Sequence, residues 1–218
     1  MRGAAAVRGA IGPVLLALLA LPFALYALDL GWRWQAGTLL EPTRIFDRPG
    51  WTSDGISLHM LGGAVITVLA PLQLVAPLRR RYPRWHRWAG RITVALALVA
   101  ALGGLGFILG RGTIGGPIMD AGFALYGGLM ALAAVQTLRF ARARELTRHR
   151  NWALRLFVLA IASWIFRVHY GLWFAATGGI GSTPALDGPF DRVQVFAFYL
   201  PYLALAEWWI RRRPTPRL

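Results

Sequence analysis

Long apolar runs separated by short polar stretches fill most of this sequence. Six of the runs are long enough to cross a hydrocarbon core of about 30 Å, which requires about 20 residues of α-helix. The pattern predicts an all-α fold, a polytopic membrane helix bundle that forms a single membrane domain over residues 1–218. The six transmembrane helices are expected near residues 11–33, 56–78, 92–110, 118–138, 152–174 and 193–210.

The first run allows a second interpretation, because Arg2 and Arg8 precede it as in the charged start of a signal peptide. The apolar core of a signal peptide is shorter, about 7 to 15 residues, and no good Ala-x-Ala cleavage site follows this run. We therefore expect the first helix to be retained in the membrane.

The composition agrees with a membrane protein and excludes several kinds of site. Hydrophobic residues make up 56% of the 218 positions and only nine residues are acidic, which does not suit an ordinary soluble domain. The chain has no cysteine, so any metal must use histidine or carboxylate ligands. The net charge is +15, but all 24 basic residues are arginines that lie between apolar runs and do not form one nucleic-acid-binding face. We expect no nucleic acid partner.

The arginines are distributed unequally between the two sides of the predicted bundle. If both termini are cytoplasmic, 18 arginines lie in inner segments, five lie in outer segments, and Arg167 lies inside a helix. This asymmetry follows the positive-inside rule and predicts that both termini are cytoplasmic. The arginine-rich stretch 79–91 is then expected to contact anionic lipid headgroups of the inner leaflet, with Trp85 and Trp88 at headgroup depth.

His86, inside this stretch, has a counterpart in His149. Each is followed by Arg and then by Trp and a further Arg, at the start of the third and the fifth predicted helix. The similarity indicates a weak internal repeat of two helical hairpins, 56–110 and 118–174, although short similarities also arise by chance in an arginine-rich chain. For both histidines, contact with a lipid phosphate or a backbone carbonyl is favoured over a catalytic or ligand role.

Four sequence elements resemble a known family. They are Leu-His-Met-Leu-Gly-Gly at 58–63, Pro-Leu-Gln at 71–73, the stretch 78–91, and Arg-His-Arg-Asn-Trp-Ala-Leu-Arg at 148–155. Over roughly residues 56–170 the chain resembles the bacterial predicted membrane proteins grouped as domain of unknown function twenty-three-oh-six. The resemblance implies a multi-pass protein of the bacterial inner (cytoplasmic) membrane and implies no particular activity.

The other two histidines lie inside predicted helices. With 100° of turn per residue, His59 heads a stripe of small and polar residues on the second helix, and His169 shares a stripe with Arg155 and Ala162 on the fifth. Such stripes face neighbouring helices and not lipid. At 1.5 Å per residue, His59 is expected about 5 Å and His169 about 8 Å below the outer end of its helix. We expect the two imidazoles to approach each other in the outer half of the membrane.

Three ionisable residues, Arg167, Asp29 and Asp120, are expected near the same depth, where a charge is costly enough to suggest a function. Two interpretations stay open. In the first, the two acids cap helices or neutralise Arg167, and the histidines are hydrogen-bonded between helices. In the second, His59 and His169 are the iron ligands of one haem b, and Arg167 lies near a haem propionate.

The haem hypothesis also needs space for a porphyrin. Glycines at 103, 104, 106, 110, 127 and 128 would make room either for a porphyrin or for a neighbouring helix. The architecture also resembles, more loosely, cytochrome b561-like bundles, although the ligands here would not come one from each of four consecutive helices. A second haem between His86 and His149 is disfavoured by their positions at the membrane interface.

The alternative function is non-redox: a transporter, a membrane assembly factor, or a membrane protein partner in a larger complex or homo-oligomer. Pro71 and Pro201 interrupt two helices, but no acid lies at midplane depth, which argues against ion-coupled transport. The sequence has no Gly-x-Ser-x-Gly, His-Glu-x-x-His or phosphate-loop motif, so it offers no support for a hydrolase. The outer loops, 39–55 and 177–192, could fold over the outer cluster, but ordinary mobile connections are favoured.

Overall fold

The structure, a computed structural model, describes residues 2–41, 43 and 45–212. Within these residues the chain forms helices and no strand. The helices are α1 (Arg2–Gln35), α2 (Trp51–Gln73), α3 (Ala76–Arg81), α4 (Pro83–Arg111), α5 (Gly116–Arg142), α6 (Leu146–Thr177), α7 (Pro189–Ala197) and α8 (Leu200–Arg212).

Prolines and glycines set several of the helix ends. Pro83 and Pro189 take the first position of α4 and α7, where the missing N–H would have had no intrahelical partner. Gly112 and Gly178 follow α4 and α6 with positive φ angles of 71° and 69°, which a residue without Cβ adopts at no steric cost. Helices α1, α4, α5 and α6 each extend beyond the predicted apolar run, because arginines and other interfacial residues continue the helix past the apolar residues.

The prediction of one helix over 56–78 is wrong, because the structure divides this run into α2 and α3. Helix α2 begins earlier, at Trp51, and ends at Gln73. Pro77 explains the end, since it has no N–H to donate to the carbonyl of Gln73 four residues earlier. The Val75 N–H instead bonds the Leu72 carbonyl in a turn, at 3.2 Å.

The sixth predicted helix, 193–210, is bent. Pro201 has no N–H to donate to the Ala197 carbonyl, so α7 ends there and α8 begins at Leu200. The whole segment Pro189–Arg212 is still long and apolar enough to cross a membrane, as are five other segments of the described residues. The predicted all-α fold with six helices able to span a membrane is confirmed.

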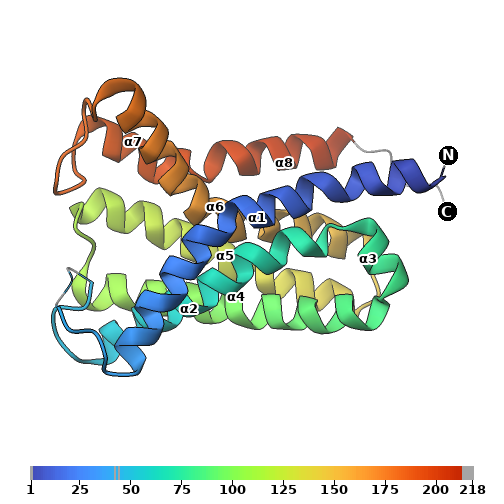
Figure 1. Cartoon of the computed structure of the whole chain (residues 1–218), viewed down its shortest axis with the longest axis horizontal. Helices are drawn as coiled ribbons and strands as arrows, with labels where there is room; N and C mark the ends of the chain where they lie inside the picture. Colours follow the sequence, from blue (N-terminus) through green and yellow to red (C-terminus); the bar gives the residue numbers. More distant parts are fainter. Residues whose placement is uncertain (1, 42, 44, 213–218) are drawn as a thin grey trace. The chain divides into compact units, whose positions relative to one another are not determined.

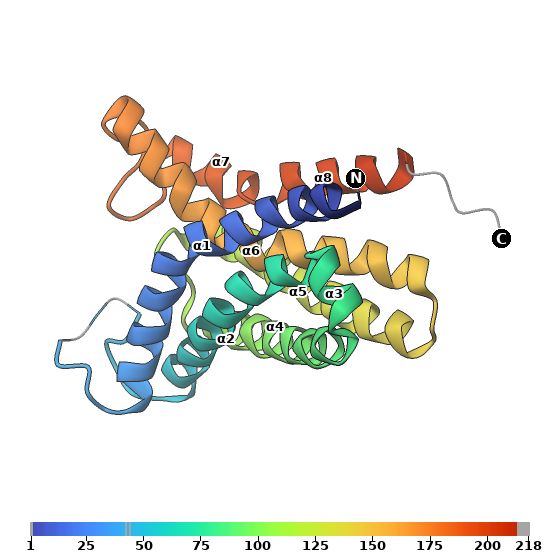
Figure 2. The ribbon, with the colours of Figure 1, turned by 45° about the vertical axis from the view of Figure 1, so that its right-hand side comes forward.

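The chain forms two compact units, residues 1–112 and 113–218. In the first unit, α2 packs against both α1 and α4, as Figures 1 and 2 show. Ala24, Ala27 and Ala64 form the core between α1 and α2, and their small side chains allow the two helices to approach closely. Helices α2 and α4 are closer still, because a Cβ atom placed on Gly103 would lie 2.2 Å from the carbonyl oxygen of Gly55.

In the second unit, α5 and α6 form a hairpin on which α7 and α8 pack. Aromatic rings fill the contact, and the rings of Tyr126 and Phe198 meet edge to face with their centroids 5.1 Å apart. The buried hydroxyl groups have partners: Tyr126 donates to the Leu159 carbonyl at 2.7 Å, and Tyr199 donates to the Gly122 carbonyl at 3.1 Å. Satisfied hydroxyls allow large aromatic side chains to be buried without a desolvation penalty.

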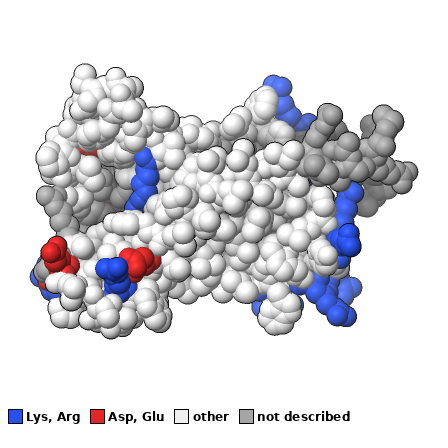
Figure 3. Space-filling model, in the orientation of Figure 1, with Lys and Arg blue, Asp and Glu red and all other residues white. Residues whose placement is uncertain are grey.

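Charged side chains are concentrated near the helix ends. On the face that Figure 3 shows, the middle of the surface is almost free of charge, and the arginine and carboxylate atoms lie toward the helix ends. The last turns of α3, α5 and α8 all carry arginines, at 79–81, at 139 and 142, and at 211 and 212. That these ends face the cytoplasm stays a prediction. Several arginines counted for it, Arg44, Arg213 and Arg217 and the side chains of Arg2 and Arg8, lie outside the described residues.

Candidate functional site

His59 lies on α2 and turns its ring toward α4. Its Nδ1 atom is 2.6 Å from the backbone carbonyl oxygen of Ala100. A carbonyl can only accept, so the neutral ring carries its proton on Nδ1 and its lone pair on Nε2. Gly104 makes the contact feasible, because a Cβ atom there would lie only 3.0 Å from the His59 Nδ1.

The glycines of α4 make room for α2. A Cβ on Gly103 would collide with the Gly55 carbonyl, and a Cβ on Gly110 would lie 2.5 Å from the Thr52 side chain and 2.8 Å from that of Trp51. Of the two expected uses of these glycines, close approach of a neighbouring helix is therefore the one observed at both positions.

His169 lies on α6, and both of its ring nitrogens are hydrogen-bonded. Its Nδ1 is 3.1 Å from Gln194 Oε1, and its Nε2 is 2.8 Å from the Tyr202 hydroxyl. The Gln194 amide nitrogen reaches the Phe166 carbonyl at 3.4 Å. Because that carbonyl can only accept, Gln194 N–H donates to Phe166 and His169 Nδ1–H donates to Gln194. In a neutral ring, Nε2 then accepts the Tyr202 O–H.

The bend in the sixth span positions this network. Gln194 lies on α7 and Tyr202 on α8, so the two partners of His169 come from opposite sides of the break at Pro201. A straight helix would place residues eight apart about 12 Å from each other along its axis. The imidazole ring therefore bridges the bend and ties both halves of the span to α6.

His59 and His169 lie equally far from the helix ends predicted to be outer. His59 is eight residues from Trp51, where α2 begins, and His169 is eight residues from Thr177, where α6 ends. At 1.5 Å per residue both lie about 12 Å from those ends. The expected distances of about 5 and 8 Å from the outer helix ends are too small, because both helices extend beyond their apolar runs at those ends. Each histidine is described within its own unit, and their joint ligation of a haem stays a prediction.

The three ionisable residues expected near the histidines have local partners. Asp29 forms an ion pair with Arg33 one turn later, with Nε and Oδ2 3.0 Å apart. Asp120 accepts the backbone N–H of Thr113 at 2.6 Å, just before α5 begins. Arg167 donates to the Ser163 carbonyl at 3.1 Å. Asp29 therefore neutralises Arg33 and not Arg167, and Asp120 holds the turn before α5 without capping that helix.

His86 and His149 occupy the same place in their helices, three residues after the first residue of α4 and of α6. The Nδ1 atom of His149 lies 3.0 Å from the Thr137 carbonyl oxygen, so this histidine makes the backbone contact that was favoured from the sequence. In each motif the later arginine also lies over the tryptophan three residues before it: Arg91 over Trp88 at 5.0 Å, and Arg155 over Trp152 at 4.7 Å.

Two glutamines precede these histidines in the chain. From the sequence, Gln73 was named only as part of the Pro-Leu-Gln element, and Gln136 was missed. Both amide atoms of Gln73 and the Oε1 atom of Gln136 are buried without a hydrogen-bond partner among the described residues. Gln73 precedes His86 by 13 residues, and Gln136 precedes His149 by the same 13 residues. This equal spacing is visible in the sequence, and it adds two positions to the internal repeat suggested by the His-Arg motifs.

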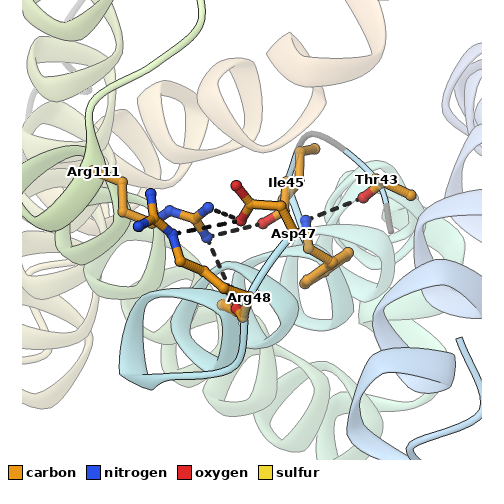
Figure 4. A network of polar contacts seen from close by, with 7 residues as sticks. Thr43, Ile45, Asp47, Arg48 and Arg111 are labelled. Atoms are coloured by element: carbon orange, nitrogen blue, oxygen red, sulfur yellow. Dashed lines mark hydrogen bonds and ion pairs between the residues drawn. The ribbon is translucent and has the colours of Figure 1, made fainter. Parts of the chain in front are cut away.

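The first outer loop is fastened to the end of α4 (Figure 4). The guanidinium of Arg111 forms an ion pair with the carboxylate of Asp47. It also donates to the Ile45 carbonyl at 3.3 Å and to Ser53 Oγ at 3.0 Å. Ser53 in turn donates to the Arg48 carbonyl at 2.7 Å. The side chain of Arg111 is only 10% exposed, so these contacts are shielded from water on the arginine side.

The same loop is anchored to α1 by an aromatic contact. Phe46 is 2% exposed and stacks on Trp34, with ring centroids 4.8 Å apart. The indole N–H of Trp34 donates to Asp54 on α2 at 2.9 Å. The sequence favoured an ordinary mobile connection, whereas the structure gives this loop specific anchors on three helices.

The second outer loop is organised around one buried carboxylate. Asp191, 1% exposed, accepts hydrogen bonds from the Tyr170 hydroxyl at 2.7 Å and the Ser182 hydroxyl at 2.8 Å. The backbone N–H groups of Thr183 and Gly188 each donate to it at 3.0 Å. Four donors compensate the buried charge and close the loop over the end of α6.

The sequence comparisons agree with the architecture. No curated protein and no solved structure matches the chain significantly. A family described as "Predicted membrane protein (DUF2306)" matches residues 56–210, which cover α3, α4, α5, α6 and α7 and most of α2 and α8. This match extends the resemblance seen in the histidine motifs through the bent sixth span that carries Gln194 and Tyr202. The chain is therefore a member of the DUF2306 family of predicted membrane proteins.

Proposed function

We propose that this protein carries electrons through one haem b in the bacterial inner membrane, with His59 and His169 as the iron ligands and both termini in the cytoplasm. One observation carries the proposal. Each imidazole has its Nδ1 within hydrogen-bond distance of an acceptor oxygen, Ala100 O for His59 and Gln194 Oε1 for His169, so Nε2 is the nitrogen that would bind iron in each ring. Metal-ligating histidines almost always have such an oriented second nitrogen.

The two residues fit an iron ligand differently. His59 is oriented by α4 with its lone pair on Nε2. His169 has the same tautomer, but its Nε2 accepts the Tyr202 hydroxyl at 2.8 Å, so iron binding requires that this bond is released. Arg167 would lie near a propionate, where a guanidinium stabilises the carboxylate.

A bound haem would supply one-electron chemistry at iron, and the protein residues set its conditions. The Nδ1 hydrogen bonds hold each ring in place and increase its basicity. The surrounding apolar helices keep water away and, with the axial ligands, adjust the reduction potential.

The proposal is tested by an optical spectrum of the purified protein from haem-replete cells, with and without dithionite. A reduced b-type haem should give its α and Soret bands. His59→Ala and His169→Ala should each abolish the bands, and His86→Ala, the control at the arginine-rich end, should keep most of them. Tyr202→Phe removes only the competing hydroxyl, so haem should be retained. A well-folded preparation without pigment would refute the proposal.

A second candidate is the non-redox role, as a membrane assembly factor, transporter or complex partner. The fully bonded state of His169 favours it, because a histidine with two satisfied nitrogens needs no metal to justify its burial. In this role the ring stabilises the bent sixth span. Tyr202→Phe would then leave Nε2 without a donor and lower the free energy of unfolding by about 1 to 3 kcal/mol.

A further inference from the structure

An apolar groove runs along the second unit between α6 and α8. Its volume is about 380 Å³. Its walls include Leu154, Phe157, Ile161 and Ile165 from α6 and Ala206 and Trp209 from α8. Almost all of the exposed lining is apolar, so the groove suits a hydrocarbon chain better than a polar solute.

The groove has the length of one membrane leaflet. From Leu154 to Ile165 it follows α6 for eleven residues, or about 16 Å at 1.5 Å per residue. Half of a hydrocarbon core of about 30 Å is about 15 Å. An acyl chain of one leaflet could therefore lie in the groove along its full length.

Positive charge borders one end of the groove. The guanidinium of Arg212 lies 4.3 Å from the ring centroid of Trp208, which lines the groove. Glu207 lies one turn before Arg211. Its carboxylate accepts hydrogen bonds from Arg211 Nε at 2.9 Å and from Arg155 Nε at 3.1 Å. Arg155 and Arg211 share the Glu207 carboxylate, and Arg212 lies in the same turn as Arg211. Three guanidiniums and one carboxylate leave two positive charges in excess at this end.

We propose that the groove binds one acyl chain of an anionic phospholipid, whose phosphate group is held by Arg211 and Arg212. The hydrocarbon chain alone gives little selectivity, because a chain in the groove leaves an equally apolar bilayer. The headgroup therefore decides which lipid binds. Arginine is suited to this task, since its planar guanidinium forms paired hydrogen bonds with phosphate oxygens.

The size of the effect follows from the charge. A basic residue near an anionic membrane surface contributes about 1 kcal/mol, so two arginines give about a 30-fold preference for an anionic over a zwitterionic lipid. No groove residue is a proposed iron ligand, although Tyr202, which lines the groove, contacts His169. Lipid retention can therefore be measured whether or not haem is bound.

The test uses the full-length protein incubated with equal amounts of phosphatidylglycerol and phosphatidylcholine of the same acyl chains. Native mass spectrometry then counts the lipids retained. The unmodified protein should keep one phosphatidylglycerol with about a 30-fold preference. The double variant Arg211→Gln, Arg212→Gln should reduce the preference to about threefold or less. Ala206→Phe, which fills the groove, should abolish retention of both lipids.

Matched controls separate a specific site from general surface charge. Arg139→Gln with Arg142→Gln removes two arginines from the last turn of α5, and Ala204→Phe adds the same ring on α8 outside the groove. Both should retain lipid as the unmodified protein does. If the α5 double variant loses the lipid preference as much as the Arg211→Gln, Arg212→Gln variant does, the preference comes from general surface charge and the proposal is overturned. It would also be overturned by a retained second copy of the chain in place of lipid, or by no retained lipid. If Ala206→Phe fails to fold by circular dichroism, Ala206→Leu serves as the smaller block.

Discussion

Replacing Gly103 with alanine tests whether the close contact between α2 and α4 orients His59. A Cβ at this position would lie 2.2 Å from the Gly55 carbonyl oxygen, whereas real Cβ atoms essentially never approach closer than 3.0 Å. The two helices must therefore separate by at least about 0.8 Å. The 2.6 Å distance from His59 Nδ1 to Ala100 O would grow to about 3.4 Å, beyond the usual limit of about 3.2 Å for a hydrogen bond.

The energetic cost has two opposing parts. Overpacking a helix contact costs about 1 to 3 kcal/mol, and the lost hydrogen bond adds about 1 kcal/mol. Alanine favours the helical conformation over glycine by about 1 kcal/mol, which offsets part of this cost. We expect Gly103→Ala to lower the free energy of unfolding by about 2 kcal/mol. A Cβ at Gly63, on α2, meets nothing within 4 Å, so Gly63→Ala should instead raise it by about 1 kcal/mol.

The assay is reversible unfolding in mixed micelles with increasing dodecyl sulfate, followed by far-UV circular dichroism. A difference of about 3 kcal/mol between the two variants corresponds to a factor of about 150 in the unfolding equilibrium. The reasoning would be refuted by equal stability of Gly103→Ala and Gly63→Ala, because that result would mean that α2 and α4 are not in backbone contact. If haem binds, its occupancy should fall in Gly103→Ala and not in Gly63→Ala.

Three further predictions concern the loops and the topology. Arg111→Ala removes the contacts that hold the first outer loop to α4. Since Asp47 is 46% exposed, we expect the free energy of local loop opening to fall by about 2 kcal/mol, seen as about 30-fold faster hydrogen exchange of the amides at 45–54. Unchanged hydrogen exchange of these amides would contradict the role of Arg111 in holding the loop. Asp191→Asn places an NH₂ group opposite hydrogen-bond donors, so we expect the free energy of unfolding to fall by about 2 to 3 kcal/mol, measured by thermal unfolding with tryptophan fluorescence. The control Asp187→Asn, in the same loop, should lower it clearly less. A C-terminal reporter should be active only in the cytoplasm, and activity only outside would reverse the predicted topology.

The number of membrane-spanning helices could be predicted from the sequence because it depends on the length of apolar runs. The helix ends were predicted less well. Arginines and tryptophans at the interface continue a helix past its apolar run, so α4 begins at Pro83 and not near residue 92. The break after Gln73 was readable, since Pro77 lies inside the predicted run and cannot donate to the residue four positions earlier.

The candidate site was predictable only in part. The helical stripe correctly placed His59 against a neighbouring helix, because a stripe of small residues fixes which face packs. The partners of His169 were not predictable in this way. Gln194 and Tyr202 are eight residues apart, and only the bend at Pro201 lets both reach one imidazole ring. The angle of a bend depends on tertiary packing and leaves no periodic signal in the sequence.

The hydrogen bond at Nε2 of His169 separates the two candidate functions. The oxygen acceptors at both Nδ1 atoms are compatible with either function. The partner of Nε2 is what distinguishes them. At His169 that partner is the Tyr202 hydroxyl, which a haem ligand must lose and a purely structural histidine must keep. Replacing this single oxygen, as in Tyr202→Phe, therefore leaves a haem protein pigmented and makes a non-redox protein less stable, so the same variant gives opposite evidence for the two functions.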